Sequence, residues 1–224
     1  MTIEYGSQYQ LGQYLVRHRP TLDARVLSLC GAASVSWIAP PPGPDGPGGF
    51  KEWKGLEFIE AQHPVQSVWR EAWPQRGNPP NWDAVGKLNR GGVSEWLLVE
   101  AKANEEELRS SCGAKPEGGR SQIERALEAT KSALGVAPDR NWLDGYYQYC
   151  NRLAVLNILT KAGIPARLLF IYFTGDTSGP RRTCPASAEG WNPALAPMKA
   201  HVGLPSQHML ADRIHELFLD VSAK

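Results

Sequence analysis

The stretch NWDAVGKLNRGGVSEWLLVEAK, residues 81–102, decides the fold that this chain is expected to adopt. Residues 81–88 read as one β-strand and residues 95–101 as a second, and the segment Asn89-Arg90-Gly91-Gly92 between them is a hairpin turn signal. The run Trp96-Leu97-Leu98-Val99 is typical of a strand that is buried on both faces in the middle of a sheet. We therefore expect an antiparallel hairpin at the centre of the molecule.

Three of the six charged residues in this segment lie at the end of the hairpin that is away from the turn. Asp83 belongs to the first strand, and Glu100 and Lys102 lie at the end of the second. Because side chains two positions apart on a strand share a face, Glu100 and Lys102 point the same way and Ala101 points into packing. Counting outward from a turn at residues 89–92 places Asp83 broadly opposite Glu100, with an offset of two residues that a bulge or a register shift can absorb.

Two carboxylates and one ammonium group would then converge beside an apolar run, and burying such charges is costly unless they are used. Asp83 and Glu100 offer the oxygen ligands that Mg²⁺ or Mn²⁺ prefers. Such an ion polarises a phosphoryl oxygen and generates a nucleophilic hydroxide from bound water. Lys102 would orient the attacking water or stabilise the negative charge of the transition state. The pattern therefore predicts metal-dependent chemistry on a phosphate ester.

At these residues the chain resembles a known family. The run Asn81-Trp82-Asp83-Ala84-Val85-Gly86, followed by Trp96-Leu97-Leu98-Val99-Glu100-Ala101-Lys102-Ala103, is similar to the D…E-x-K core of the PD-(D/E)XK nuclease superfamily. The resemblance covers about residues 51–176 and implies a restriction-endonuclease-like fold, in which a mixed central sheet is flanked by helices. It also implies that Asp83 and Glu100 bind the metal and that Lys102 is the catalytic lysine.

The resemblance implies two further site residues. An acidic residue before the hairpin joins the metal site in many such families, and Glu57 is the best match, with Glu60 behind it. A glutamine on the helix after the core is also common, so Gln148 is the candidate for a catalytic role and Gln122 is its rival. Trp82 stands where the family's proline would precede the aspartate, which departs from the family pattern.

The E-x-K pattern by itself is not specific. A second copy, Glu52-Trp53-Lys54, follows the proline- and glycine-rich segment and has no apolar strand before it, so we interpret it as unrelated to the site. The alternative for Glu100 and Lys102 is a surface ion pair at a strand end, which would contribute little to stability. An aspartate in one strand, a glycine turn and four apolar residues running into E-x-K favour the active-site interpretation.

The rest of the chain alternates predicted helices and strands. We expect helices at residues 8–29 with a break at Pro20, 51–61, 121–134, 142–162 and 206–218, strands at 34–38 and 167–174, and either state at 65–73. The last helix is compatible with a short strand at its end, residues 217–221. This order indicates an α/β fold with a mixed central sheet and helical additions at both ends. We expect a single domain over residues 1–224, made of an N-terminal helical region (1–38), a flexible Pro/Gly loop (39–50), the nuclease-like core (51–176) and a C-terminal extension (177–224).

Composition limits the classes of function. The net charge is +1, from 24 Lys and Arg against 23 Asp and Glu, so a nucleic-acid partner would have to bind a local patch. The four cysteines are far apart with no C-x-x-C pair, which excludes a zinc ribbon and a thioredoxin-like motif and indicates reduced thiols. No apolar stretch reaches the roughly 18 residues of a membrane span, and the N-terminus lacks a secretory signal. We expect a cytoplasmic protein without membrane contact.

The first hypothesis is a divalent-metal-dependent nuclease that hydrolyses phosphodiester bonds, with DNA as the expected nucleic acid. A homodimer or another protein partner is compatible with it, because the chain has no separate DNA-reading domain. The alternative is a catalytically silent interaction protein that retains the nuclease-like fold. A third hypothesis is an enzyme with the same metal site and a different phosphate substrate.

Overall fold

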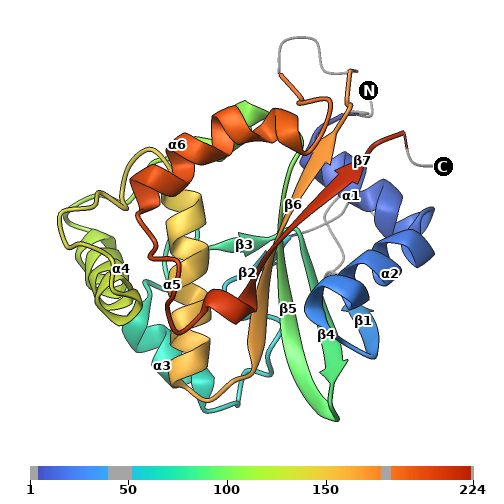
Figure 1. Cartoon of the computed structure of the whole chain (residues 1–224). Helices are drawn as coiled ribbons and strands as arrows, with labels where there is room; N and C mark the ends of the chain where they lie inside the picture. Colours follow the sequence, from blue (N-terminus) through green and yellow to red (C-terminus); the bar gives the residue numbers. More distant parts are fainter. Residues whose placement is uncertain (1–4, 40–51, 178–182, 223–224) are drawn as a thin grey trace.

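Five strands form a mixed sheet through the middle of the computed structural model, which describes residues 5–39, 52–177 and 183–222 (Figure 1). In spatial order the strands are β1 (Ser34–Ile38), β4 (Ala84–Arg90), β5 (Val93–Lys102), β6 (Ala166–Thr174) and β7 (Ile214–Asp220). The pairs β1–β4 and β4–β5 are antiparallel, and β5–β6 and β6–β7 are parallel. A two-stranded ribbon of β2 (Trp53–Lys54) and β3 (Asn81–Trp82) leads into β4. The predicted α/β fold with a mixed sheet is confirmed.

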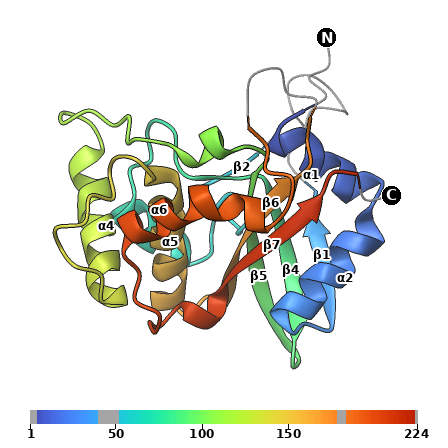
Figure 2. The ribbon, with the colours of Figure 1, turned by 45° about the horizontal axis from the view of Figure 1, so that its top comes forward.

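Helices cover both faces of this sheet (Figures 1 and 2). One face carries α1 (Ser7–Val16) and α2 (Arg19–Cys30), and the other carries α3 (Val65–Ala72), α4 (Arg120–Leu134), α5 (Tyr147–Lys161) and α6 (Asn192–Val202). Successive side chains of β6 enter alternate cores: Leu168 and Phe170 pack in the core that includes α5, whereas Leu169 and Ile171 pack with α1 and α2. Burial on both faces accounts for the uninterrupted apolar sequence of β6. Within the described ranges, no helix combines the length and apolarity that crossing a bilayer requires.

The helix α5 is enclosed by the rest of the protein. Its residues 150–159 are all buried, because β6 packs on one side and α3 and α4 pack on others. A helix that is apolar all round is expected in such an enclosed position. The parallel pair β5–β6 needs a crossover connection, which α4 and α5 supply, and the first turn of α5 thereby lies beside the carboxyl end of β5.

The turn between β4 and β5 consists of Gly91 and Gly92 alone, because Arg90 pairs with Val93. The φ angles of the two glycines are +59° and +82°, in the left-handed region that a two-residue type I′ hairpin turn requires. The predicted hairpin is confirmed, but the turn predicted at residues 89–92 is too long by two residues, since Asn89 and Arg90 belong to β4.

This short turn sets the register of the hairpin. The ladder of paired residues ends with Ala84 opposite Val99. Asp83 directly precedes this pair, and its N–H donates to the Val99 carbonyl oxygen, so the pairing does not continue regularly to Glu100. The offset of two residues that the longer turn implied is absent from the ladder, and the irregularity lies at Asp83 itself.

Two predicted helices differ from the structure because of glycines. The segment predicted as a helix at residues 51–61 forms β2 and turns from residue 52 onward, and Gly55 with φ of +52° interrupts regular helix. The helix predicted at residues 142–162 begins only at Tyr147, because Gly145 with φ of +83° lies just before it.

The helix predicted at residues 206–218 is wrong, whereas the short strand considered at residues 217–221 overlaps the observed strand. The segment contains a 3₁₀ turn, Ala211–Arg213, and then the strand β7. Leu217 and Leu219 pack in the core next to α1 and α2, while Phe218 packs against the other core, which is the alternation of a strand. The C-terminal extension therefore adds an edge strand as well as α6, and the N-terminal region likewise adds β1.

Three other predicted elements agree with the structure to within one residue at each end. They are the strands at 34–38 and 167–174 and the helix at 121–134. Pro20 lies in the first turn of α2 and so starts the second of two N-terminal helices. Residues 65–73, which were compatible with either state, form α3. The predicted Pro/Gly loop at 39–50 lies outside the described residues except for residue 39.

Replacing Gly92 by alanine tests the turn. An added Cβ at Gly92 would meet no atom within 4 Å, so the cost is confined to the left-handed backbone. We expect Gly92→Ala to lower the free energy of unfolding by about 1–2 kcal/mol in a urea titration. Gly113→Ala is the matched control, because Gly113 also has open space but no left-handed φ, and it should be neutral or slightly stabilising. Equal effects of the two substitutions would contradict the turn assignment.

Candidate functional site

Asp83 is fixed at the carboxyl end of β5 by two backbone contacts. Its own N–H donates to the carbonyl oxygen of Val99 at 3.0 Å, and its Oδ2 accepts from the N–H of Ala101 at 2.7 Å. Asp83 thus lies in the short gap between β3 and β4, and its side chain reaches across the hairpin. The carboxylate is held beside the part of β5 that carries Glu100 and Lys102.

Glu100, Lys102 and Gln148 form a hydrogen-bonded group. Lys102 Nζ donates to Glu100 Oε1 at 2.6 Å and to Gln148 Oε1 at 2.7 Å. Gln148 lies in the first turn of α5, where its N–H donates to Ser110 Oγ at 2.8 Å. Glu100 and Lys102 are only 2% and 9% exposed, so the alternative of a surface ion pair is wrong. Ala101 is fully buried among side chains on the opposite face of the sheet, as its place in the strand predicts.

Arg152 is a member of this group that the sequence analysis did not identify. It follows Gln148 by four residues on α5, so the two side chains leave the same face of the helix. Its Nε donates to Glu100 Oε2 at 2.8 Å, and its Nη2 forms an ion pair with the same oxygen at 2.7 Å. Its guanidinium carbon lies 5.0 Å from the centre of the Trp82 ring, and the side chain is buried. The spacing Gln148-x-x-x-Arg152 was the only available signal, and a single sequence does not distinguish it from packing.

The two carboxylates have opposite electrostatic environments. Burial acts to raise the pKa of Glu100, but the positive charges of Arg152 and Lys102 outweigh it and bring the pKa below its usual value. Burial, followed by repulsion from Glu100, raises the pKa of Asp83 to about 7, and Lys102 and the Ala101 N–H only partly oppose these effects. Neighbouring positive charges therefore balance the negative charge of Glu100, whereas the negative charge of Asp83 is only partly balanced.

Asp83 and Arg152 line an open cleft of about 270 Å³, together with Glu52, Pro79, Pro80, Asn81, Ser110, Tyr147, Gln148 and Asn151. Glu52 contributes a third carboxylate to this cleft. Its Oε2 accepts from Asn81 Nδ2 at 2.7 Å, and its charge also raises the pKa of Asp83. The interpretation that Glu52-Trp53-Lys54 is unrelated to the site is thus not supported, because the pairing of Trp53 with Trp82 brings this segment to the cleft.

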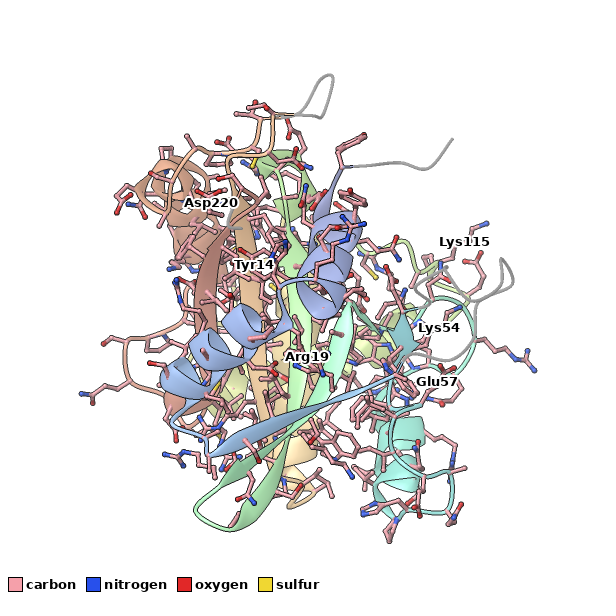
Figure 3. The ribbon with its side chains drawn as sticks, turned by 90° about the vertical axis from the view of Figure 1, so that its right-hand side faces the viewer. Tyr14, Arg19, Lys54, Glu57, Lys115 and Asp220 are labelled. Carbon is pink, nitrogen blue, oxygen red and sulfur yellow. The ribbon has the colours of Figure 1, made fainter. Side chains whose placement is uncertain are left out.

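Glu57, Glu60 and Gln122 do not join this group. Glu57 and Glu60 line a different hollow of about 580 Å³, and Glu57 Oε2 accepts from the N–H of Lys54 at 3.3 Å. Figure 3 shows Glu57 and Lys54 close together to one side of the sheet. Gln122 Nε2 donates to two carbonyl oxygens at the end of α3. Glu57 was chosen as a candidate because a helix was expected at residues 51–61. Since that helix does not form, the Glu57 side chain points in a different direction relative to the hairpin.

The donors at the cleft fit a hard divalent cation. In the described part of the chain, no three His, Cys, Asp or Glu side chains are close enough to form a ready metal site. Mg²⁺ is commonly bound by only one or two carboxylates, with waters and substrate phosphate as its other ligands. Asp83 and Glu100 meet that requirement, and a cation would stabilise the charged form of Asp83.

Comparisons with protein-family models, with curated proteins and with solved structures find no match to this chain. The chemistry of the cleft is therefore inferred from the geometry of this chain.

The raised pKa of Asp83 predicts a pH-dependent effect on stability. Between about pH 4.5 and 7 the folded protein binds a proton at Asp83 that the unfolded chain has released, so this residue makes folding less favourable as pH rises. Glu100 does not contribute in this window, because its lowered pKa leaves it charged in both states above its usual value of 4.5. In metal-free buffer, Asp83→Asn should gain stability relative to the unmodified protein as pH rises to about 7.

The measurement is the free energy of unfolding at several pH values, with Asp139→Asn on an exposed turn as the control. The comparison between variants removes the contribution of the histidines. A stability difference for Asp83→Asn that stays constant from pH 4.5 to 8 would contradict the assigned environment.

Proposed function

We propose that this chain is a divalent-metal-dependent nuclease that hydrolyses phosphodiester bonds, with DNA as substrate and Mg²⁺ or Mn²⁺ as cofactor. The observation that carries the proposal is that Asp83 lines an open cleft and is hydrogen-bonded to Val99 and Ala101, the two neighbours of the Glu100 carboxylate on β5. The hydrogen bonds of Lys102 to Glu100 and Gln148 support it. The hairpin within a mixed sheet flanked by helices is compatible with a restriction-endonuclease-like fold, which we propose as well.

In this proposal Asp83 and Glu100 hold the cation, and Glu52 is a candidate for an additional ligand through water. The bound cation would polarise a phosphoryl oxygen and lower the pKa of a bound water. Two of the three Lys102 N–H groups donate to Glu100 and Gln148 among the described residues, which leaves one for a substrate oxygen. Gln148 thus positions Lys102 toward the cleft. A donor aimed at the developing negative charge stabilises the transition state.

The residues around the cleft, the net charge and the cysteines are relevant to the proposed substrate and the proposed location of the protein in the cell. The cleft offers neutral hydrogen-bonding groups on Asn81, Ser110 and Asn151, which suit contacts to a phosphate backbone. Because the net charge is only +1, a second copy of the chain or another protein would extend the contact with DNA. The free thiols of Cys30, Cys112, Cys150 and Cys184 accord with the reducing cytoplasm.

The second candidate function is an interaction protein that keeps the fold without catalysis. One observation favours it: Lys102 and Arg152 already neutralise Glu100, so the buried ion pairs have a structural role without any metal. Metal binding separates the two candidates. A structural cluster has no requirement for a divalent cation, whereas the proposed nuclease binds one through Asp83 and Glu100.

Cleavage assays test the proposed nuclease. Purified protein with Mg²⁺ or Mn²⁺ should cleave labelled single- or double-stranded DNA, and RNA tested in parallel defines the substrate. Lys102→Met should reduce the rate by about 10²–10³-fold, because it removes one donor to the transition state. Lys87→Met is the matched control, since Lys87 lies on the same hairpin against the Trp96 ring and away from the cleft lining.

Calorimetry with Mn²⁺ on Asp83→Asn completes the test. We expect loss of binding with the secondary structure retained in circular dichroism. Unchanged cleavage by both Lys102→Met and Asp83→Asn would reject this site. No cleavage and no metal binding by the unmodified protein would favour the interaction protein.

A further inference from the structure

Arg152 is held by three neighbouring side chains. Its Nε donates to Glu100 Oε2, its Nη2 forms an ion pair with the same oxygen, its Nη1 donates to Asn151 Oδ1 at 2.7 Å, and the face of the guanidinium lies over Trp82. The side chain is 2% exposed and nevertheless contributes to the lining of the cleft. Arg152 is therefore a buried cation at the edge of the space in which a metal ion and a phosphate would bind.

The hydrogen bonds of Glu100 limit how a metal ion can reach it. A carboxylate has about four lone-pair positions, two on each oxygen. Oε2 accepts a hydrogen bond from Arg152 Nε and lies 2.7 Å from Arg152 Nη2 in an ion pair, and Oε1 accepts a hydrogen bond from Lys102. Among the described residues, the guanidinium thus covers Oε2, and a donor already occupies one position on Oε1. A cation that binds Glu100 must share the carboxylate with these groups or displace one of them.

The positive charge of Arg152 also opposes the binding of a metal ion. A divalent cation shared by Asp83 and Glu100 would lie close to the positive charge of Arg152, and like charges repel strongly where water is excluded. Removing Arg152 from Glu100 altogether would leave a buried carboxylate with Lys102 as its only cation, which is unfavourable for folding. The same guanidinium therefore stabilises the metal-free protein and opposes the ion.

We infer that Arg152 is a positioning residue that holds the Glu100 carboxylate in the metal-free protein and competes with the divalent cation for it. This inference rests on the proposed metal-dependent function of the site. Competition between two ligands for one group is reciprocal, so metal binding also weakens the contact of Arg152 with Glu100. The affinity of the site for metal is accordingly lower than its carboxylates alone would produce.

Mn²⁺ titration of the full chain without nucleic acid tests the competition, with free Mn²⁺ measured by electron paramagnetic resonance. Arg152→Met keeps a long apolar side chain but removes the charge and both donors, and it should bind Mn²⁺ about tenfold more tightly than the unmodified protein. Arg152→Lys keeps the charge with fewer donors and should have an intermediate affinity. Arg120→Met is the control for loss of one positive charge, because Arg120 pairs with Glu124 on α4 outside the cleft lining, and it should leave the affinity unchanged.

A double-mutant cycle locates the competition at Glu100. In a Glu100→Gln background the tightening caused by Arg152→Met should largely disappear, because the shared carboxylate is gone. Tightening of the same size in that background would reject the inference in favour of a general charge effect. Circular dichroism and thermal melting establish whether each variant is folded, and Arg152→Lys decides the comparison if Arg152→Met does not fold.

The results separate this inference from the proposed function. If the unmodified protein binds Mn²⁺ through Asp83 and the Arg152 variants bind it equally well or more weakly, only the competition is rejected. If neither the unmodified protein nor any Arg152 variant binds Mn²⁺, both the metal site and the competition are rejected. Binding that is detectable only after Arg152 is replaced would support the competition.

Discussion

The two-glycine turn of the β4–β5 hairpin is the constraint on which the site depends. A strand alternates its side chains between two faces, so a register shift of one residue would turn Glu100 and Lys102 toward α1 and α2. With the observed register both side chains project toward α5, and hydrogen bonds to Val99 and Ala101 hold Asp83 beside Glu100. The turn has this form because both of its residues can adopt left-handed backbone without steric cost.

The charged group in turn connects the sheet to α5. Burying Glu100 would be unfavourable alone, but Lys102 from the same strand and Arg152 from the helix compensate its charge. Breaking a buried pair of this kind typically costs about 3–5 kcal/mol, so the position of α5 and the ionisation of Glu100 are linked. Asp83, in contrast, has no ion pair among the described residues, and burial together with repulsion from Glu100 raises its pKa. One carboxylate thus supports the fold, and the negative charge of the other is only partly compensated.

The parts of the site predicted from the sequence are those that depend on neighbours along a strand. Glu100 and Lys102 share a face because they are two residues apart, and the glycine pair between apolar runs indicates the hairpin. Arg152 was missed because a basic residue within an apolar helix is equally compatible with packing. Glu52 was missed because its approach to the cleft depends on a ribbon between segments that are 29 residues apart in the chain.

The sequence alone therefore determined the mixed α/β character, the hairpin and which three of its charged residues lie together, since strand alternation and turn chemistry are local properties. Only the tertiary structure decided which acidic residue accompanies Asp83, with Glu52 in the cleft and Glu57 in a separate hollow. It also decided that Gln148 rather than Gln122 contacts Lys102. The reason is physical: which helix packs on which part of the sheet depends on the summed burial of many side chains, and no short segment contains that information.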